Sequence, residues 1–341
     1  MVATINAFFN PTKPGDTFKG LNGSVKGETS SRLITSLPEF LREAKRDYSI
    51  QVVPAFQRLP TGDFAAVEDQ FHLVRSVDQR VVSPKTVSSQ YDPLSLMEAA
   101  SEVQPFCDAG WATPDGVYDA KNGSLEVLSL RLDAQGEIAG EKFLHYIVVV
   151  IPHGGGKAQG KVISWRIVCC NTFAAAVSAG YDFAIGHRKA RADEVGTVTK
   201  ERFSLEVQAW QNVQKHIQKL SEKINVWNGV NLAYKDAEDL TNRLLGIKNP
   251  EEVSTRKKNV RDMILSGFNN AKIGTRGRTA WDWLNGVTSY TSNGMPESKV
   301  TDIDRMVRNI EPTGTGFKLE QEAEKLLADF QPARPMGPGL I

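Results

Sequence analysis

Residues 124–180 decide the fold, and they read SLEVLSLRLDAQGEIAGEKFLHYIVVVIPHGGGKAQGKVISWRIVCCNTFAAAVSAG. Apolar and polar residues alternate over 124–132, and β-branched residues dominate 142–152 and 161–169. Both patterns are typical of strands, and the three glycines at 154–156 mark a break between the second strand and the third. This stretch therefore predicts three consecutive strands of an antiparallel meander.

An Ala-rich run follows the third strand directly. It covers 171–180 and closes at Gly180, a common helix stop. We expect Asn171 and Thr172 to cap this helix and to order its junction with the strand. The predicted local order is β-β-β-α, which is the core of an α+β fold.

The sequence before this stretch predicts an extension of the same sheet. Its expected elements are a helix over 33–46 with Ser36 as N-cap, strand-like segments within 49–87, and a helix from Asp92 to about Val103. The residues Pro-Thr-Gly-Asp at 60–63 predict a turn between the first two strand-like segments. We expect one mixed, mostly antiparallel sheet from about 48 to 170.

The carboxyl-terminal half is helical by its periodicity. After Lys200, apolar residues recur every three or four positions, at Phe203, Val207, Trp210, Val213, Ile217, Leu220 and Ile224. Shorter helices are predicted around 235–246, 250–268, 279–291 and 318–330. The expected division is a flexible arm (1–30), an α+β core domain (31–200), a helical region packed on the core (201–330) and a disordered Pro/Gly-rich tail (331–341).

The composition is that of an ordinary globular protein. The 341 residues carry a formal net charge of +1, so a polyanion site would have to come from local clusters of basic residues. Three cysteines, Cys107, Cys169 and Cys170, are too few for a disulfide framework and indicate a reducing compartment. No signal peptide and no apolar run near the ~20 residues of a membrane span is present. We expect a cytoplasmic protein with no membrane contact, no metal and no other cofactor.

A phosphate-binding loop is suggested at 155–162 by the sequence GGKAQGKV. Such a loop needs a hydroxyl at its last position and a helix after it, whereas Val162 has no hydroxyl and the following segment alternates like a strand. We therefore expect a hairpin tip here, whose basic side chains His153, Lys157 and Lys161 would project and could attract an anion.

Two further patterns suggest catalysis. Asp115 and Glu126 have the spacing of a metal-dependent nuclease core, but Leu128 replaces the lysine of that pattern, and a turn with an exposed strand face is the alternative. Cys169 or Cys170 could act as a nucleophile with His187 as its base, although thiols at a strand end beside a helix are usually packed in a core. We predict no enzymatic activity.

Basic residues gather in two clusters. The first, 187–191, contains Arg188, Lys189 and Arg191. The second contains Arg256, Lys257, Lys258, Arg261, Lys272, Arg276 and Arg278 against a single acid, Asp262. Such side chains can follow a phosphate backbone, and the neighbouring Trp281 and Trp283 could stack on bases. The alternative is a solvated loop before a helix whose tryptophans belong to the core.

Three segments resemble a phage- and plasmid-associated family, domain of unknown function 932: RIVCCNTFAAAVSA (166–179), IGHRKA (185–190) and TAWDWLNGVTSYTSN (279–293). The matching positions are Arg166, Ile167, Val168, Cys169, Asn171, Thr172, Ile185, His187, Trp281, Asn285 and Tyr290. Cys170 departs from the family, in which a Gln is expected. The resemblance covers roughly residues 50–295 and implies a mobile genetic element in the cytosol of a bacterial host, near replication and recombination functions.

The β-β-β-α order is also similar to the core of single-strand annealing proteins, which form rings or filaments and hydrolyse no nucleotide. This similarity implies ATP-independent binding and annealing of single-stranded DNA by a homo-oligomer, in phage or plasmid recombination or replication. The expected phosphate contacts are Arg188, Lys189, Arg191, Lys272, Arg276 and Arg278, with Lys157 and Lys161 as auxiliaries. Arg166 either lies in the same groove or pairs with an acid. The alternative, which the near-neutral charge favours, is a protein-binding regulator or anti-defence factor of a mobile element.

Overall fold

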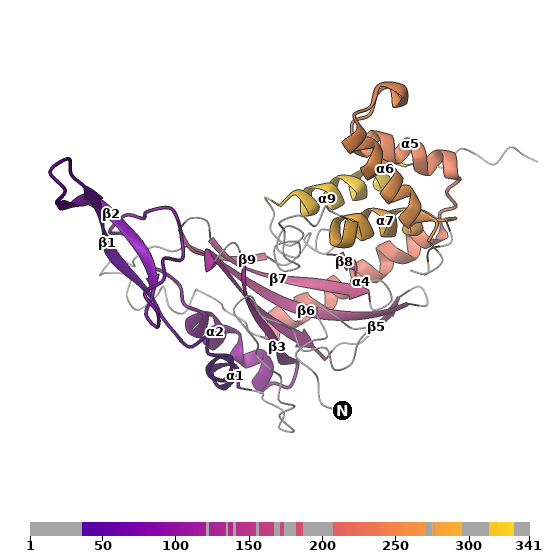
Figure 1. The fold of residues 1–341 in the computed structure, drawn as a ribbon. Coiled ribbons are helices and arrows are strands. Elements are labelled where there is room, and N and C mark those ends of the chain that lie inside the picture. Colours follow the sequence, from indigo (N-terminus) through magenta and orange to yellow (C-terminus); the bar gives the residue numbers. More distant parts are fainter. Residues whose placement is uncertain are drawn as a thin grey trace, which may run out of the picture.

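The computed structural model contains two antiparallel sheets and a group of carboxyl-terminal helices (Figure 1). It describes residues 36–120, 123–133, 136–138, 141–154, 157–166, 171–173, 182–186, 207–270, 275, 277–294 and 314–330. The predictions of an α+β fold and of a helical carboxyl-terminal half are confirmed. The predicted arm (1–30) and tail (331–341), together with Cys169, Cys170 and His187, lie outside the described residues. In this part of the chain, no helix is both long enough and apolar enough to cross a membrane.

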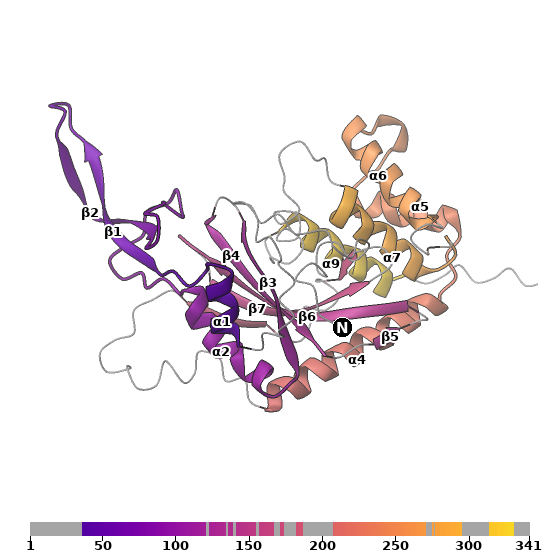
Figure 2. The same cartoon turned by 60° about the horizontal axis from the view of Figure 1, so that its bottom comes forward.

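The smaller sheet is a two-stranded ribbon made of β1 (Ile50–Arg58) and β2 (Phe64–Arg75). The predicted turn joins the two strands: Leu59 N donates to Asp63 O at 2.7 Å, and Gly62 takes the positive φ of 94° that favours glycine. Figures 1 and 2 both show the ribbon projecting from the body of the molecule.

The expected continuous sheet from 48 to 170 is wrong, because the ribbon forms a sheet of its own. The third strand-like segment, 80–87, adds only two isolated bridges to the ribbon, Val74 to Val81 and Phe71 to Val87. Strand-like alternation therefore identified β1 and β2, but it could not tell which sheet they join.

Among the described residues, the larger sheet has seven strands in the order β3-β4-β6-β7-β8, with β5 beside β6 and β9 beside β7. Their bounds are β3 Ala112–Ala120, β4 Leu125–Leu132, β5 Gly136–Ile138, β6 Glu141–Pro152, β7 Lys157–Arg166, β8 Asn171–Phe173 and β9 Asp182–Gly186. Every pairing is antiparallel, and β4, β6 and β7 form the predicted meander.

The helix predicted over 171–180 is wrong at its first three residues, which form β8. Asn171 pairs with Arg166 and Thr172 with Trp165, so the chain continues the ladder of β7 instead of starting a helix. The expected capping role of Asn171 and Thr172 is therefore wrong, and residues 174–180 lie outside the described part of the chain. Ladder hydrogen bonds to an existing strand outweigh the weak local preference for a helix.

Helices cover one face of the larger sheet. α1 (Leu37–Glu43), α2 (Leu96–Asp108) and α4 (Val207–Gly229) lie on this face in Figure 2. The core between the layers includes Leu37, Phe40, Val103, Leu128, Ile147, Leu220 and Ile224. The predicted N-cap is confirmed, since Ser36 Oγ accepts from Glu39 N.

The remaining helices pack together at one end of the sheet (Figure 1). They are α5 (Tyr234–Leu244), the 3₁₀ turn η2 (Pro250–Glu252), α6 (Thr255–Phe268), α7 (Ala280–Ser289), the π-helical turn η4 (Tyr290–Gly294) and α9 (Thr315–Ala328). They confirm the helices predicted in this half of the chain. α6 and α7 touch backbone to backbone at Gly267 and Gly286, where a Cβ on Gly267 would lie 2.9 Å from Gly286 Cα.

Candidate functional site

The tip of the β1–β2 ribbon carries two exposed aromatic rings. Phe56 is 59% exposed and Phe64 is 70% exposed. Phe56 pairs with Ala66 and Arg58 pairs with Phe64, so both rings and the Arg58 side chain share one face of the ribbon. The two phenylalanines are diagonal neighbours across the two strands, about 7–8 Å apart. Their side chains therefore form one exposed apolar patch. We call Phe56, Arg58 and Phe64 the tip platform.

The base of the ribbon is fixed to the body by a small core of its own, formed by Tyr48, Ile50, Leu73 and Val82. A two-stranded ribbon is at best marginally stable alone, so this packing is what holds the projecting arm together. A register shift between Pro54 and Phe56 separates the packed base from the exposed tip. The tip platform is therefore held out in solvent by a fixed support.

A buried polar network joins the base of the ribbon to the larger sheet. The Tyr48 hydroxyl donates to Glu126 Oε1 at 2.6 Å, and His153 Nε2 lies 2.9 Å from Glu126 Oε2. Burial and the Glu126 carboxylate raise the pKa of Tyr48, so its hydroxyl stays protonated and keeps donating. On β3, beside Glu126, Asp119 binds Arg46 at 2.5 Å. Oε1 of Glu126 thus holds the base of the ribbon to the larger sheet, while Oε2 bonds His153, which follows β6 of that sheet.

Replacing Tyr48 with phenylalanine is expected to lower the free energy of unfolding by about 1–3 kcal/mol, because it leaves Glu126 Oε1 without a buried donor. Urea denaturation followed by circular dichroism measures this change. Tyr234→Phe is the matched control, since Tyr234 is 56% exposed and should lose nothing. Equal unfolding midpoints for the two variants would show that the network does not anchor the ribbon.

A second polar cluster lies on the other face of the larger sheet. Asp115 sits at a bulge in β3, and the Ser129 hydroxyl donates to its carboxyl at 3.3 Å. Burial raises the pKa of Asp115 to about 7, although the Arg131 guanidinium and the Ser129 hydroxyl oppose the rise. Burial likewise raises the pKa of Tyr118. This cluster is a buried, largely uncharged hydrogen-bonded group below neutral pH.

The nuclease-like pair does not form a site. Glu126 and Ser129 are three positions apart in β4 and point to opposite faces, and Asp115 is bonded to Ser129. The two carboxyl groups therefore cannot share a metal ion. The alternative of an exposed strand face is also wrong, since Asp115 is 4% exposed and Glu126 is 2% exposed. Within the described ranges, no three His, Cys, Asp or Glu side chains are arranged to hold a metal.

The hairpin tip predicted at 153–161 is wrong for two of its residues. Lys161 is 2% exposed, and its Nζ lies 4.4 Å from the centre of the Phe317 ring. His153 is 4% exposed and belongs to the buried network. The physical reason is that β7 begins at Lys157 and pairs on both sides, so Lys161 lies inside the sheet instead of at a tip.

Of the other predicted phosphate contacts, the structure places only Arg278 with its side chain. It is exposed just before α7, and Leu232 N donates to its backbone oxygen at 2.8 Å. Lys157 and Arg166 are residues of β7 whose side chains lie outside the description. The other five, Arg188, Lys189, Arg191, Lys272 and Arg276, also fall outside the described residues.

The second basic cluster is only partly available to a partner. Arg256, Lys257 and Lys258 are exposed at the start of α6, whereas Arg261 forms an ion pair with Glu238. The neighbouring tryptophans are core residues and cannot stack on bases. Trp281 is 2% exposed and Trp283 is 0% exposed.

The sequence patterns did not predict the tip platform, although the sequence contains a signal for it. In PAFQRLPTGDFAAV (54–67) the two phenylalanines stand on either side of the turn. A strand that buries one of its faces would place such aromatic side chains inward. Only the topology shows that neither sheet nor helix among the described elements covers this tip.

The fold and the site together define an α+β protein with a helical carboxyl-terminal half and an aromatic-tipped projecting ribbon. The chain belongs to the family described as Domain of unknown function (DUF932), which matches residues 84–320. That range contains the larger sheet and the helices from α2 through α7, while α1 and the ribbon precede it. No curated protein and no solved structure matches the chain.

Proposed function

We propose that this protein binds single-stranded DNA and promotes its annealing without ATP, as a homo-oligomer in phage or plasmid recombination or replication. The observation that carries the proposal is the tip platform, in which two exposed phenyl rings flank an arginine on one face of a fixed arm. Bases stack on such rings whatever their sequence, and the guanidinium neutralises a nearby phosphate.

The geometry suits annealing in particular. A base that stacks face-on against Phe56 or Phe64 leaves its pairing edge open to a complementary strand. The exposed cations Arg256, Lys258 and Arg278 supply further phosphate contacts, to which the proposal adds Arg188, Lys189, Arg191, Lys272 and Arg276 from the sequence. A protein that positions strands in this way needs no nucleotide hydrolysis, which agrees with the incomplete phosphate-binding loop at 155–162.

A protein-binding regulator of a mobile element is the second candidate. It is favoured by the exposed Val77 and Val81 beside the ribbon, which are 68% and 47% exposed, and by the acids Asp63, Glu68 and Asp69 on β2 and its turn. An apolar surface with mixed charge is common in protein interfaces. The experiment below separates the two candidates.

The test is fluorescence anisotropy with a labelled single strand of ~40 nucleotides, long enough for several binding sites, at low and moderate salt. We expect salt-sensitive binding without nucleotide, followed by faster pairing when the complementary strand is added. The double variant Phe56→Ala/Phe64→Ala should weaken binding at least about tenfold, since each stacked base contributes about 1–3 kcal/mol.

The matched control is Val77→Ala/Val226→Ala, which removes two equally exposed apolar side chains, 68% and 64% exposed, away from the tip. Its affinity for the strand should stay within about twofold of the unmodified protein. Absence of binding at low salt, where electrostatic attraction is strongest, would discard the proposal and favour the protein-binding regulator.

A further inference from the structure

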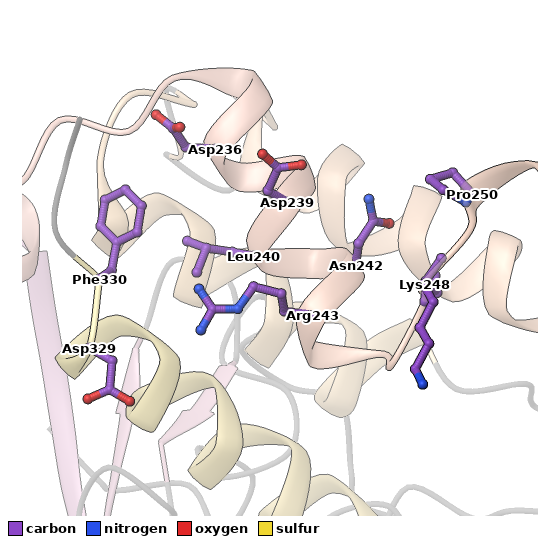
Figure 3. A pocket seen from close by; sticks show the side chains of 10 residues that line it. Asp236, Asp239, Leu240, Asn242, Arg243, Lys248, Pro250, Asp329 and Phe330 are labelled. Atoms are coloured by element: carbon purple, nitrogen blue, oxygen red, sulfur yellow. The ribbon is translucent and has the colours of Figure 1, made fainter.

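An open pocket of about 830 Å³ lies between α5, the loop that follows α5 and the end of α9 (Figure 3). Its apolar lining includes Leu240 of α5, Ile247 of the loop and Phe330 just beyond α9. The volume falls in the range of pockets that hold small organic ligands. We call it the α5–α9 pocket.

Acidic and basic side chains both line the α5–α9 pocket. In Figure 3, Asp236 and Asp329 lie at the end marked by Phe330, Lys248 lies at the opposite end, and the guanidinium of Arg243 points toward the Phe330 end. Arg243 and Lys248 are exposed, and neither forms an ion pair within the part of the chain that the structure describes. A ligand with an anionic end and a hydrogen-bond-donating end would match this arrangement.

A carboxylate supplies acceptors for the donating end of that ligand. Asp239 lines the α5–α9 pocket and is exposed, so its oxygens can accept hydrogen bonds from a bound ligand.

We propose that the α5–α9 pocket binds one nucleotide whose base carries an exocyclic amino group. The phosphate would contact Arg243 and Lys248, the base would pack on Phe330, and the amino group would donate to the Asp239 carboxylate. Thymine carries a carbonyl oxygen where cytosine carries the amino group, so the carboxylate repels it. The inference rests on the proposed function, because the nucleotide would be one unit of the bound strand, although a free mononucleotide offers the same groups.

The experiment is isothermal titration calorimetry of the full chain with deoxycytidine monophosphate and with thymidine monophosphate. We expect the cytidine nucleotide to bind at least about tenfold more tightly, which corresponds to about 1.4 kcal/mol. Arg243→Gln should weaken binding of both nucleotides about tenfold, because both share the phosphate. Asp239→Asn should bring the two affinities together, because its amide can also donate to the thymine oxygen.

The control is Arg42→Gln. Arg42, like Arg243, is an exposed arginine in the last turn of a helix, so both variants lose the same favourable interaction with the helix dipole. Equal affinities for the two nucleotides, or equal effects of Arg42→Gln and Arg243→Gln, would overturn the assignment of the pocket.

Homopolymers separate this inference from the proposed function. If the tip variants weaken oligonucleotide binding while (dC)₂₀ and (dT)₂₀, strands of about 20 residues, bind equally, the pocket assignment fails and the function stands. If the mononucleotide binds with the stated preference but neither strand binds at low salt, the function fails and the pocket is a site for free nucleotides.

Discussion

Replacing Gly286 with alanine is expected to destabilise the fold by more than about 3 kcal/mol. A Cβ at this position would lie 2.4 Å from Ile264 O and 2.8 Å from Phe268 N. Both atoms belong to the backbone of α6, so no change of side-chain rotamer relieves the overlap, and α6 and α7 must move apart. Their separation would open the core around Trp283 and Leu284, which are 0% and 1% exposed.

Chemical denaturation with urea, followed by tryptophan fluorescence, measures this loss. Gly229→Ala is the control, because Gly229 ends α4 and a Cβ there would meet nothing within 4 Å. An alanine in open space should be neutral or slightly stabilising, since it reduces the conformational entropy of the unfolded chain. An unchanged midpoint in Gly286→Ala would mean that α6 and α7 do not meet backbone to backbone.

The strands that sequence patterns located best are those with the strongest alternation or β-branching. β4 and β6 lie within one residue of their predicted bounds, and β7 lies within four. β3 was not predicted as a strand, because Pro114 and Asp115 read as turn residues and the bulge that accommodates them depends on pairing with β4. Pairing is a property of two segments together, so neither segment shows it alone.

The residues of the candidate site also could not be predicted from the sequence alone. Basic clusters in a sequence predict a polyanion site only if their side chains reach solvent, and Lys161 lies against Phe317 instead. Phe56 and Phe64 look like core residues by type, and only the projection of the ribbon exposes them. Residue type predicted which side chains would be exposed, and the topology changed which of them are.

Replacing Asp115 with asparagine is expected to stabilise the protein at pH 8 by up to about 4 kcal/mol and to leave its stability near pH 3.5 almost unchanged. Burial raises the folded pKa of Asp115 to about 7, well above its ordinary value of 3.8. Between these two values the folded state holds the proton while the unfolded state has released it, so stability falls as pH rises from about 4 to about 7. Asparagine is neutral at every pH, keeps an acceptor for the Ser129 hydroxyl, and removes this loss.

The measurement is the difference in unfolding free energy between Asp115→Asn and the unmodified protein at several pH values, because other titrating groups cancel in the difference. Asp69→Asn is the control of opposite sign: hydrogen bonds from Ser89 lower the pKa of Asp69, so that carboxylate stabilises the fold above the pKa and loses its effect as pH falls. A difference that grows between pH 4 and 7 for Asp115, and not for Asp69, means that a proton on Asp115 is part of the folded structure. A flat difference would mean that Asp115 is ionised in the folded protein, with Arg131 compensating its charge fully.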